Sequence, residues 1–432
     1  MNTIVHAASA KKTGRQSGTL SVVVLLLALT GSLLSCDLFE EGVAELWTDI
    51  PEFAFYAAKF NNSQDMYKIH VSYVENIPQA VQRSERKPAL LAGTFLKSTI
   101  LRPHLQQLDY LFSELKLSER QFYPTLFGTG RVEDKQLLLP VSFNLPMVIF
   151  QAADDKNRQN NFIISRQEIM DTAGSFDTKR GESYTKMGFS PRWNPEFLLS
   201  AVQLEGASFR EGDPVRWDKI GLESAIAGLR KMISESHSSA QAEDDFKFRY
   251  LYIPEYKAVQ EGRARFAWMN SASFFLLPEE QRSQLAFRWL GQAESIRLED
   301  STVFAGMCRT ASGKDAAEAF LKWFYSEDTQ RSLLQEARET RLMENSFGIA
   351  GGFSALRVIN EKAFPDYYPS LLGKLPPAEY LQPAQGLPAG WPDIKKNVLL
   401  PFLLQATGDK PPEDLFGALE SAMRTWGRQH SY

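Results

Sequence analysis

Residues 137–151, LLLPVSFNLPMVIFQ, constrain the architecture more than any other part of the chain. The segment has two apolar, strand-like halves that are separated by Ser142-Phe143-Asn144, and each half carries a proline, Pro140 or Pro146. Proline cannot donate to a β-ladder, so a single central strand should not hold two of them. We therefore predict a segment that leaves one sheet and enters another. An edge strand with an irregular loop is the alternative.

Strand-like and helix-like patterns alternate before this segment, which is typical of an α/β protein. The sequence ELWTDIPEFAFYAAKFNN predicts a strand that ends near Trp47, followed by a helix with apolar side chains at helical spacing. Either Thr48 or Asp49 could cap that helix. Residues 68–74, KIHVSYV, alternate apolar and polar side chains as a strand does.

Helical patterns predominate after residue 162. Asn194 followed by Pro195 is typical of a helix start. Residues 312–337, SGKDAAEAFLKWFYSEDTQRSLLQEA, predict a strongly amphipathic helix. Residues 234–245, SESHSSAQAEDD, are polar throughout and predict an exposed loop.

The composition limits the classes of function. A chain of 432 residues is long enough for two or three domains. Its net charge of −4, without a long Lys/Arg block, argues against a nucleic-acid partner. Two cysteines are too few for a disulfide framework or a cysteine-based zinc site. Aromatic residues reach 12%, and a surplus of Trp is typical of sites that stack on flat ligands or sugar faces.

The N-terminus has the order of an export signal, with cations first, then an apolar run and then small residues. The run at residues 20–30 is about 11 residues long, shorter than the roughly 20 that span a bilayer. The following LLSC resembles the bacterial lipobox, in which the cysteine receives a lipid. Residues 1–35 would then be a lipoprotein signal peptide, Cys36 the lipid attachment site and residues 36–43 a tether. An uncleaved N-terminal anchor is the alternative.

The order of these segments resembles the extracellular solute-binding proteins of bacterial ABC importers, particularly the sugar-binding type. The matching segments are the lipobox, residues 45–62, 68–74 and 139–150, AVQEGRARFAWMNSASFF at 258–275, and GKDAAEAFLKWFYSEDTQRSLL at 313–334. Together they cover nearly all of the chain after the signal. The chain departs from the family pattern at Ala89, where Asp is usual, at Gln151, where Asn is usual, in FAWMNSAS, which lacks the common glycine, and at Gly351-Gly352, which replace a proline-containing turn.

The resemblance implies an α/β, two-lobed periplasmic-binding-protein-like fold with hinge-connected lobes and a central ligand cleft. Binding would close the hinge, because only the closed state contacts the ligand from both lobes. The expected division is residues 44–143 plus 300–345 for lobe 1, residues 147–298 plus 346–432 for lobe 2, and crossings near 140–147 and 298–302.

Sugars present apolar faces ringed by hydroxyl groups, so their sites combine aromatic platforms with planar polar groups. From their predicted places at strand ends, helix starts, the hinge and a Gly/Pro loop, we select eight candidate ligand-binding residues: Trp47, Asp49, Phe143, Asn144, Trp193, Trp268, Asn270 and Trp391. Packing is the alternative for each tryptophan, and helix capping is the alternative for Asp49. Four further tryptophans are predicted to pack: Trp217, Trp289, Trp323 and Trp426.

Motifs of catalysis are missing from the sequence. The five histidines are scattered, and neither a Gly-x-Ser-x-Gly elbow nor a phosphate-binding Gly-Lys loop occurs. Cys308, in VFAGMCRT, is predicted to be a buried small residue. We predict no catalytic residue, no metal and no cofactor.

We therefore predict an exported monomer that is lipid-anchored to a bacterial membrane. It would bind a small molecule, a sugar in our interpretation, and deliver it to the transmembrane subunits of an ABC permease. Nucleic acid is not an expected partner. Two alternatives stay open, a surface-anchored carbohydrate-active enzyme and a sensory binding protein that docks on a receptor.

Overall fold

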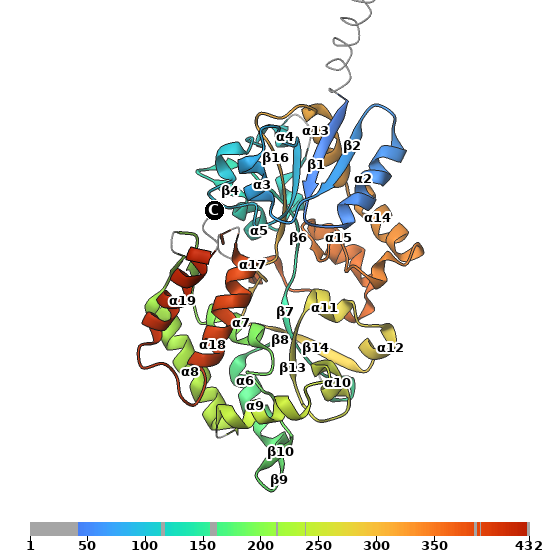
Figure 1. The fold of residues 1–432 in the computed structure, drawn as a ribbon. Coiled ribbons are helices and arrows are strands. Elements are labelled where there is room, and N and C mark those ends of the chain that lie inside the picture. Colours follow the sequence, from blue (N-terminus) through green and yellow to red (C-terminus); the bar gives the residue numbers. More distant parts are fainter. Residues whose placement is uncertain are drawn as a thin grey trace, which may run out of the picture.

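The computed structural model describes residues 42–113, 117–155, 162–212, 215–237, 239–383, 387–388 and 390–429. These residues form two α/β lobes, drawn one above the other in Figure 1. The predicted signal peptide, Cys36 and most of the predicted tether lie outside the described residues.

The first lobe contains a six-stranded mixed sheet of order β17-β6-β16-β3-β1-β2. Its strands are β1 (Val43–Thr48), β2 (Lys68–Tyr73), β3 (Leu90–Thr94), β6 (Leu139–Phe143), β16 (Val303–Met307) and β17 (Phe353–Ser354). β1 pairs in parallel with β2 and β3, so the carboxyl ends of these three strands share one edge. Phe95, directly after β3, packs on a core cluster of the second lobe, so this edge faces that lobe.

The helices of the first lobe are α2 (Glu52–Ser63), α3 (Ile77–Arg83), α4 (Tyr110–Ser113), α5 (Pro124–Thr129), α13 (Lys314–Phe324), α14 (Glu327–Glu339), α15 (Arg357–Lys362) and α16 (Phe364–Tyr367). A short hairpin pairs β4 (Arg131–Val132) with β5 (Lys135–Gln136). The predicted strand–helix opening is confirmed by β1 and α2, and the predicted strand at residues 68–74 is confirmed by β2.

The second lobe contains a four-stranded sheet of order β13-β7-β14-β8. Its strands are β7 (Pro146–Gln151), β8 (Ile163–Ile164), β13 (Ala267–Asn270) and β14 (Leu285–Leu290). Two hairpins lie outside this sheet, β9 (Thr178–Arg180) with β10 (Ser183–Lys186), and β11 (Phe209–Arg210) with β12 (Arg216–Trp217).

The helices of the second lobe are α6 (Arg166–Ala173), α7 (Pro195–Leu204), α8 (Lys219–His237), α9 (Ala240–Arg249), α10 (Glu255–Gln260), α11 (Ser271–Phe275), α12 (Glu279–Arg282), α17 (Trp391–Ile394), α18 (Leu400–Ala406) and α19 (Leu415–Gln429). A π-helical turn, Lys395–Leu399, joins α17 to α18. Asn194 caps α7 as predicted, accepting from the Glu196 N–H at 3.1 Å.

The predicted crossing within residues 137–151 is confirmed, because β6 belongs to the first sheet and β7 to the second. β6 tolerates Pro140 because this residue pairs with one neighbouring strand only. β16 pairs with Pro140, whereas β17 pairs with Ser142 and Phe143. The register against β16 also shifts at this point. Proline is accommodated where a strand has a free edge or an irregularity.

A second passage runs from β14 to β16 through β15 (Ile296–Arg297), which pairs with β18 (Leu381–Gln382). The expected division needs one correction. β17 lies within the part of the chain assigned to lobe 2, but it pairs with β6 in the sheet of the first lobe. The chain therefore returns to the second lobe only after β17, by a third passage that contains β18 and leads to α17.

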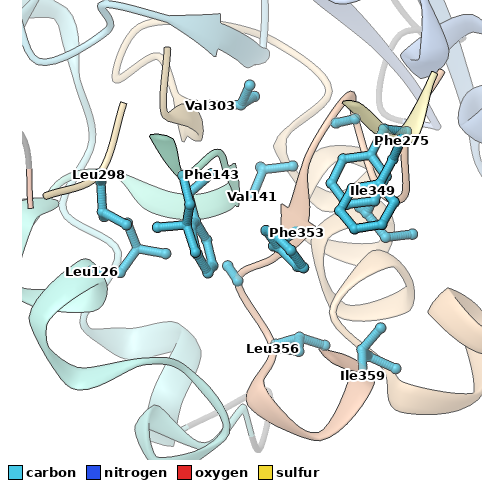
Figure 2. Packing of buried hydrophobic residues seen from close by; sticks show 14 of the residues in the cluster. Leu126, Val141, Phe143, Phe275, Leu298, Val303, Ile349, Phe353, Leu356 and Ile359 are labelled. Carbon is cyan, nitrogen blue, oxygen red and sulfur yellow. The ribbon is translucent and has the colours of Figure 1, made fainter. Parts of the chain in front are cut away.

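The buried core is continuous between the lobes. One large cluster covers a face of each sheet, and two further clusters cover the other faces. Figure 2 shows the large cluster at the crossing, where Phe143 of β6 lies among Val141, Phe353 and Leu298. Phe275 of the second lobe stacks on Phe347 with ring centroids 4.6 Å apart.

Two local predictions are wrong. The amphipathic segment 312–337 forms two helices, α13 and α14, because the chain breaks at Tyr325 and Ser326 before a new acidic first turn. Residues 234–245 are mostly helical instead of an exposed loop, and they bury His237 and Glu243. By contrast, Cys308 is 0% exposed after β16, as predicted, and burial raises the pKa of its thiol to about 12.

Candidate functional site

The sheet edge that faces the second lobe carries Asp49 at the end of β1. Its carboxylate accepts hydrogen bonds from the Thr94 N–H at 3.2 Å and from the Thr94 hydroxyl at 2.7 Å, both at the end of β3. Gly93 leaves room for this contact, because a Cβ there would lie 2.3 Å from Asp49 Oδ1. Burial raises the pKa of Asp49, and the bonds from Thr94 oppose that shift. The arrangement holds a carboxylate with further acceptor capacity at the lobe boundary.

Neither Thr48 nor Asp49 caps α2. Pro51 occupies the capping position and no side chain bonds to the helix end, while the Thr48 hydroxyl accepts from the Ile50 N–H at 3.0 Å. Trp47 lies on the face of the sheet opposite α2. It is half-buried there and packs on the cluster that includes Ile77 and Val81 of α3. Its indole donates to Glu45 at 2.6 Å.

Glu211 connects the two lobes directly. This residue follows β11 in the second lobe, and its carboxylate accepts from the Thr99 N–H of the first lobe at 2.8 and 2.9 Å. Arg102 Nη2 lies 3.8 Å from Glu211 Oε2. The contact joins the loop after β3 to the hairpin of β11 and β12.

A groove of about 1050 Å³ lies beside Glu211, between the β12–α8 segment and α19. Trp217, Met423 and Trp426 are among the residues that line it. Both tryptophans are half-buried, so part of each ring is exposed while the rest packs on the second lobe. The Trp217 indole N–H is buried without a hydrogen-bond partner among the described residues.

The rim of this groove is polar. Its charged residues are Arg216, Lys219, Glu420, Arg424 and Arg428. Among them Lys219 pairs with Glu420 at 3.0 Å across the groove, from α8 to α19. Aromatic surfaces flanked by guanidinium and carboxylate groups are the combination that sugar rings and their hydroxyl groups require.

Four predicted ligand residues are instead part of the core. Trp391, Phe143, Trp268 and Trp193 are 0%, 2%, 5% and 9% exposed. The Trp391 indole donates to Asp300 at 2.5 Å, and Trp193 packs edge-on against Phe246 with centroids 5.3 Å apart. In this conformation the three tryptophans pack in the core, which was the alternative considered for them. Ligand contact by these four residues stays a prediction.

The two predicted asparagines have structural contacts. Asn144 lies in the crossing, where its amide donates to the Gly351 carbonyl at 2.9 Å and its oxygen accepts from the Ser271 hydroxyl at 2.6 Å. Asn270 caps α11 by accepting from the Ser273 N–H at 2.8 Å. Asn144 thus joins the first crossing to both lobes, whereas Asn270 organises one helix start.

A cluster of ionisable groups lies at the return crossing. Lys395 Nζ is 3.0 Å from Asp300 and 3.3 Å from Glu196. Burial, followed by the charge of Asp300, raises the pKa of Glu299 to about 8, and Lys395 opposes the shift. The Glu299 N–H donates to the Asn144 carbonyl at 2.9 Å, so this cluster is attached to both crossings.

The described ranges contain no group of three or more His, Cys, Asp or Glu side chains that could hold a metal ion. The sequence contains two adjacent pairs of acids, Asp154-Asp155 and Asp244-Asp245, and each has a member in an ion pair: Asp155 pairs with Lys374 and Asp244 pairs with Arg192. In the part of the chain that the structure describes, no helix combines the length and apolarity needed to cross a bilayer.

Two α/β lobes, joined by crossing strands and facing each other across strand ends, define the periplasmic-binding-protein fold. Solved structures confirm it. The sugar-binding protein MalE from Xanthomonas citri aligns with a TM-score of 0.65 at 11% identity, over 90% of this chain and 99% of that chain. The ABC substrate-binding protein Lmo0181 from Listeria monocytogenes, solved with cycloalternan, aligns at 0.57 and 11%, over 90% and 99%.

The maltose/maltodextrin-binding domain MalE from Bdellovibrio bacteriovorus, bound to maltotriose, aligns with a TM-score of 0.55 at 13% identity, over 90% of this chain and all of that chain. At these identities the likeness establishes the fold. No protein-family model matches the sequence, and no curated protein matches it either.

Trp217 and Trp426 pack on the second lobe as predicted, and they also line the groove. Their sequence context does not show which part of each ring stays exposed, and sequence reasoning did not select Glu211. Glu211 lies in a short polar connection without a motif. The available signal is in the sequence EGDP, where Glu211 precedes a Gly-Asp-Pro run that favours a loop.

Proposed function

We propose that the protein is an extracytoplasmic sugar-binding protein of an ABC importer, and that it acts as a binding protein and not as an enzyme. The observation that carries this proposal is the groove with Trp217 and Trp426 beside the Glu211 contact between the lobes. The structural neighbours support the sugar class, since Lmo0181 was solved with cycloalternan and the Bdellovibrio bacteriovorus MalE domain with maltotriose.

In this proposal the sugar lies at the lobe boundary. Trp217 and Trp426 stack on its apolar faces from the second lobe, and Asp49 accepts hydroxyl hydrogens from the first lobe. Aromatic stacking supplies affinity, whereas the carboxylate supplies orientation. Closure of the lobes completes the site in this proposal, because the two tryptophans belong to the second lobe and Asp49 belongs to the first.

We also propose that the chain is exported and lipid-anchored through Cys36, so that it delivers sugar to the transmembrane subunits of the permease. The lipobox-like LLSC supports this. Membrane-fraction mass spectrometry tests it: the wild-type chain should have the mass of an acylated protein that begins at Cys36. Cys36→Ala should yield an unlipidated precursor, and an identical mass for both would contradict the anchor.

A thermal-shift screen tests the ligand class. Neutral oligosaccharides of glucose and mannose should raise the melting temperature by mass action, whereas polyols, amino acids and polyamines should not. Chromatography of the same samples should recover the sugar intact. If only charged ligands stabilise the protein, the proposed sugar class is wrong. If the sugar is converted to products, the protein is an enzyme and not a binding protein.

A further inference from the structure

A second groove, of about 630 Å³, lies on the first lobe between the segment after α3, the β4–β5 hairpin and the start of α13. Four cations line it, Arg102, Lys135, Arg309 and Lys314, against a single lining carboxylate, Glu133. The whole chain has a net charge of −4, so this local excess of cations is opposite in sign to the molecule.

These cations are only partly neutralised. Arg102 is 3.8 Å from Glu211 at the boundary with the second lobe. Arg309 donates to the Pro103 carbonyl at 2.6 Å, and Lys314 donates to the Arg309 carbonyl at 2.7 Å. Within the described ranges neither of these two nor Lys135 forms an ion pair with a carboxylate.

Backbone and neighbouring groups add to the positive character of the groove. α13, which is 11 residues long, begins at Lys314; no side chain caps its N-terminus, although Asp315 places one carboxylate in its first turn. Helix N-termini carry partial positive charge and attract anions. Burial, followed by the charges of Lys87 and Arg309, lowers the pKa of the adjacent His104. One nearby carboxylate, Glu318, is occupied by the Tyr110 hydroxyl.

We propose that this groove binds a small multivalent anion, of the class of phosphate or sulfate esters, at a site separate from the tryptophan groove. Arg102 and Arg309 supply planar guanidinium groups that match the oxygens of such esters, and Lys135 and Lys314 supply point charges. The volume exceeds that of a single phosphate group, so the site accommodates a diphosphate or an ester with its attached group.

Isothermal titration calorimetry with inorganic pyrophosphate, and separately with glucose 6-phosphate, tests the proposal at fixed low ionic strength. We expect saturable one-to-one binding that weakens as salt is added. Arg309→Gln and Lys135→Gln should each weaken it by about tenfold, the usual effect of one charge-assisted contact. Lys135 makes no described ion pair, so that variant should keep its fold.

The matched control is Lys322→Gln, which removes an exposed charge from the same helix α13 outside the groove. It should bind both probes as the wild type does. Equal affinities of the wild type and the groove variants, or an equal loss in the control, would overturn the site. If glucose 6-phosphate binds more tightly than glucose and Lys135→Gln weakens its binding, the ligand is a phosphate ester. If only pyrophosphate binds in this way, the ligand is the free anion.

Discussion

Trp217 and Trp426 differ from Trp391 in how much of the ring is exposed. Both pack on the second lobe, yet both also line the groove. Trp391, with no exposed surface, is held inside the same lobe and its indole is bonded to Asp300. An exposed part of the ring is the physical condition for stacking on a sugar, so exposure separates these residues where residue type does not.

We predict that Trp217→Ala and Trp426→Ala each lower sugar affinity by about 1–2 kcal/mol, a factor of roughly 5–30, because each removes one stacking surface. Calorimetric titration with the best sugar of the screen measures this. Trp323→Ala, in the first lobe, is the control: it should lower the melting temperature and leave the affinity unchanged. If both groove variants bind the sugar with wild-type affinity, Trp217 and Trp426 contribute to packing only.

Sequence alone could identify the candidate residue types but not their surroundings. The pattern places Asp49 at the end of a strand, and the structure has it directly after β1, bonded to Thr94 at the end of the parallel strand β3. Trp391 was expected in an open Gly/Pro loop. The loop instead leads into α17, and the ring is buried where that helix begins, an outcome that depends on distant packing partners.

At the scale of elements, the connections between the lobes were only partly predictable. Sequence could locate the first crossing because two prolines in one apolar run exclude a central strand. It could not place β17 in the first lobe, because a two-residue strand leaves no periodic signal. It likewise joined α13 to α14, since the apolar periodicity continues through the break at Tyr325.

The return crossing should make stability depend on pH through Glu299. Its pKa is raised to about 8, so the folded protein holds a proton that the unfolded chain releases above its ordinary pKa of 4.5. The stabilisation is therefore complete below that ordinary value and is lost as pH rises through about 8. The groups facing it are Glu196, Asp300 and Lys395.

Melting temperatures of the wild type and of Glu299→Gln, measured from about pH 5 to about pH 9, test this. The wild type should lose more stability across that range than the variant, which carries no titrating proton at this position. Parallel curves for the two proteins would show that Glu299 does not hold its proton in the folded state.

The contact of Glu211 should stabilise the closed arrangement of the lobes. Glu211→Gln removes the charge that accepts from Thr99 and faces Arg102, so the closed complex should open faster. We expect sugar dissociation, followed by stopped-flow tryptophan fluorescence, to accelerate by about fivefold, equivalent to about 1 kcal/mol.

Glu205→Gln provides the matched control for that experiment, because Glu205 pairs with Arg166 at 2.8 Å within the second lobe. Its dissociation rate should equal that of the wild type. An unchanged rate in Glu211→Gln, or an equal acceleration in both variants, would show that the contact between the lobes does not hold the bound state.

At the scale of the whole molecule, the two-lobed fold was predictable because several weak segments occur in one order along nearly the entire chain. The relation between the lobes was not. It depends on a core cluster that continues through the crossing and on contacts such as Phe275 with Phe347, which join residues far apart in sequence. The ligand cannot be deduced from the fold, because binding proteins of one fold differ in their grooves.

If a sugar binds between the lobes and closes them, the distance between the lobes must shorten on binding. Spin labels at Lys322 in α13 and Lys231 in α8, each changed to Cys in a Cys36→Ser background, measure that distance; Cys308 is buried and should stay unlabelled. Saturating sugar should shift the distance distribution toward one shorter population, and Trp217→Ala with Trp426→Ala should require more sugar for the same shift. Sugar that binds by calorimetry without changing the distribution would contradict the account.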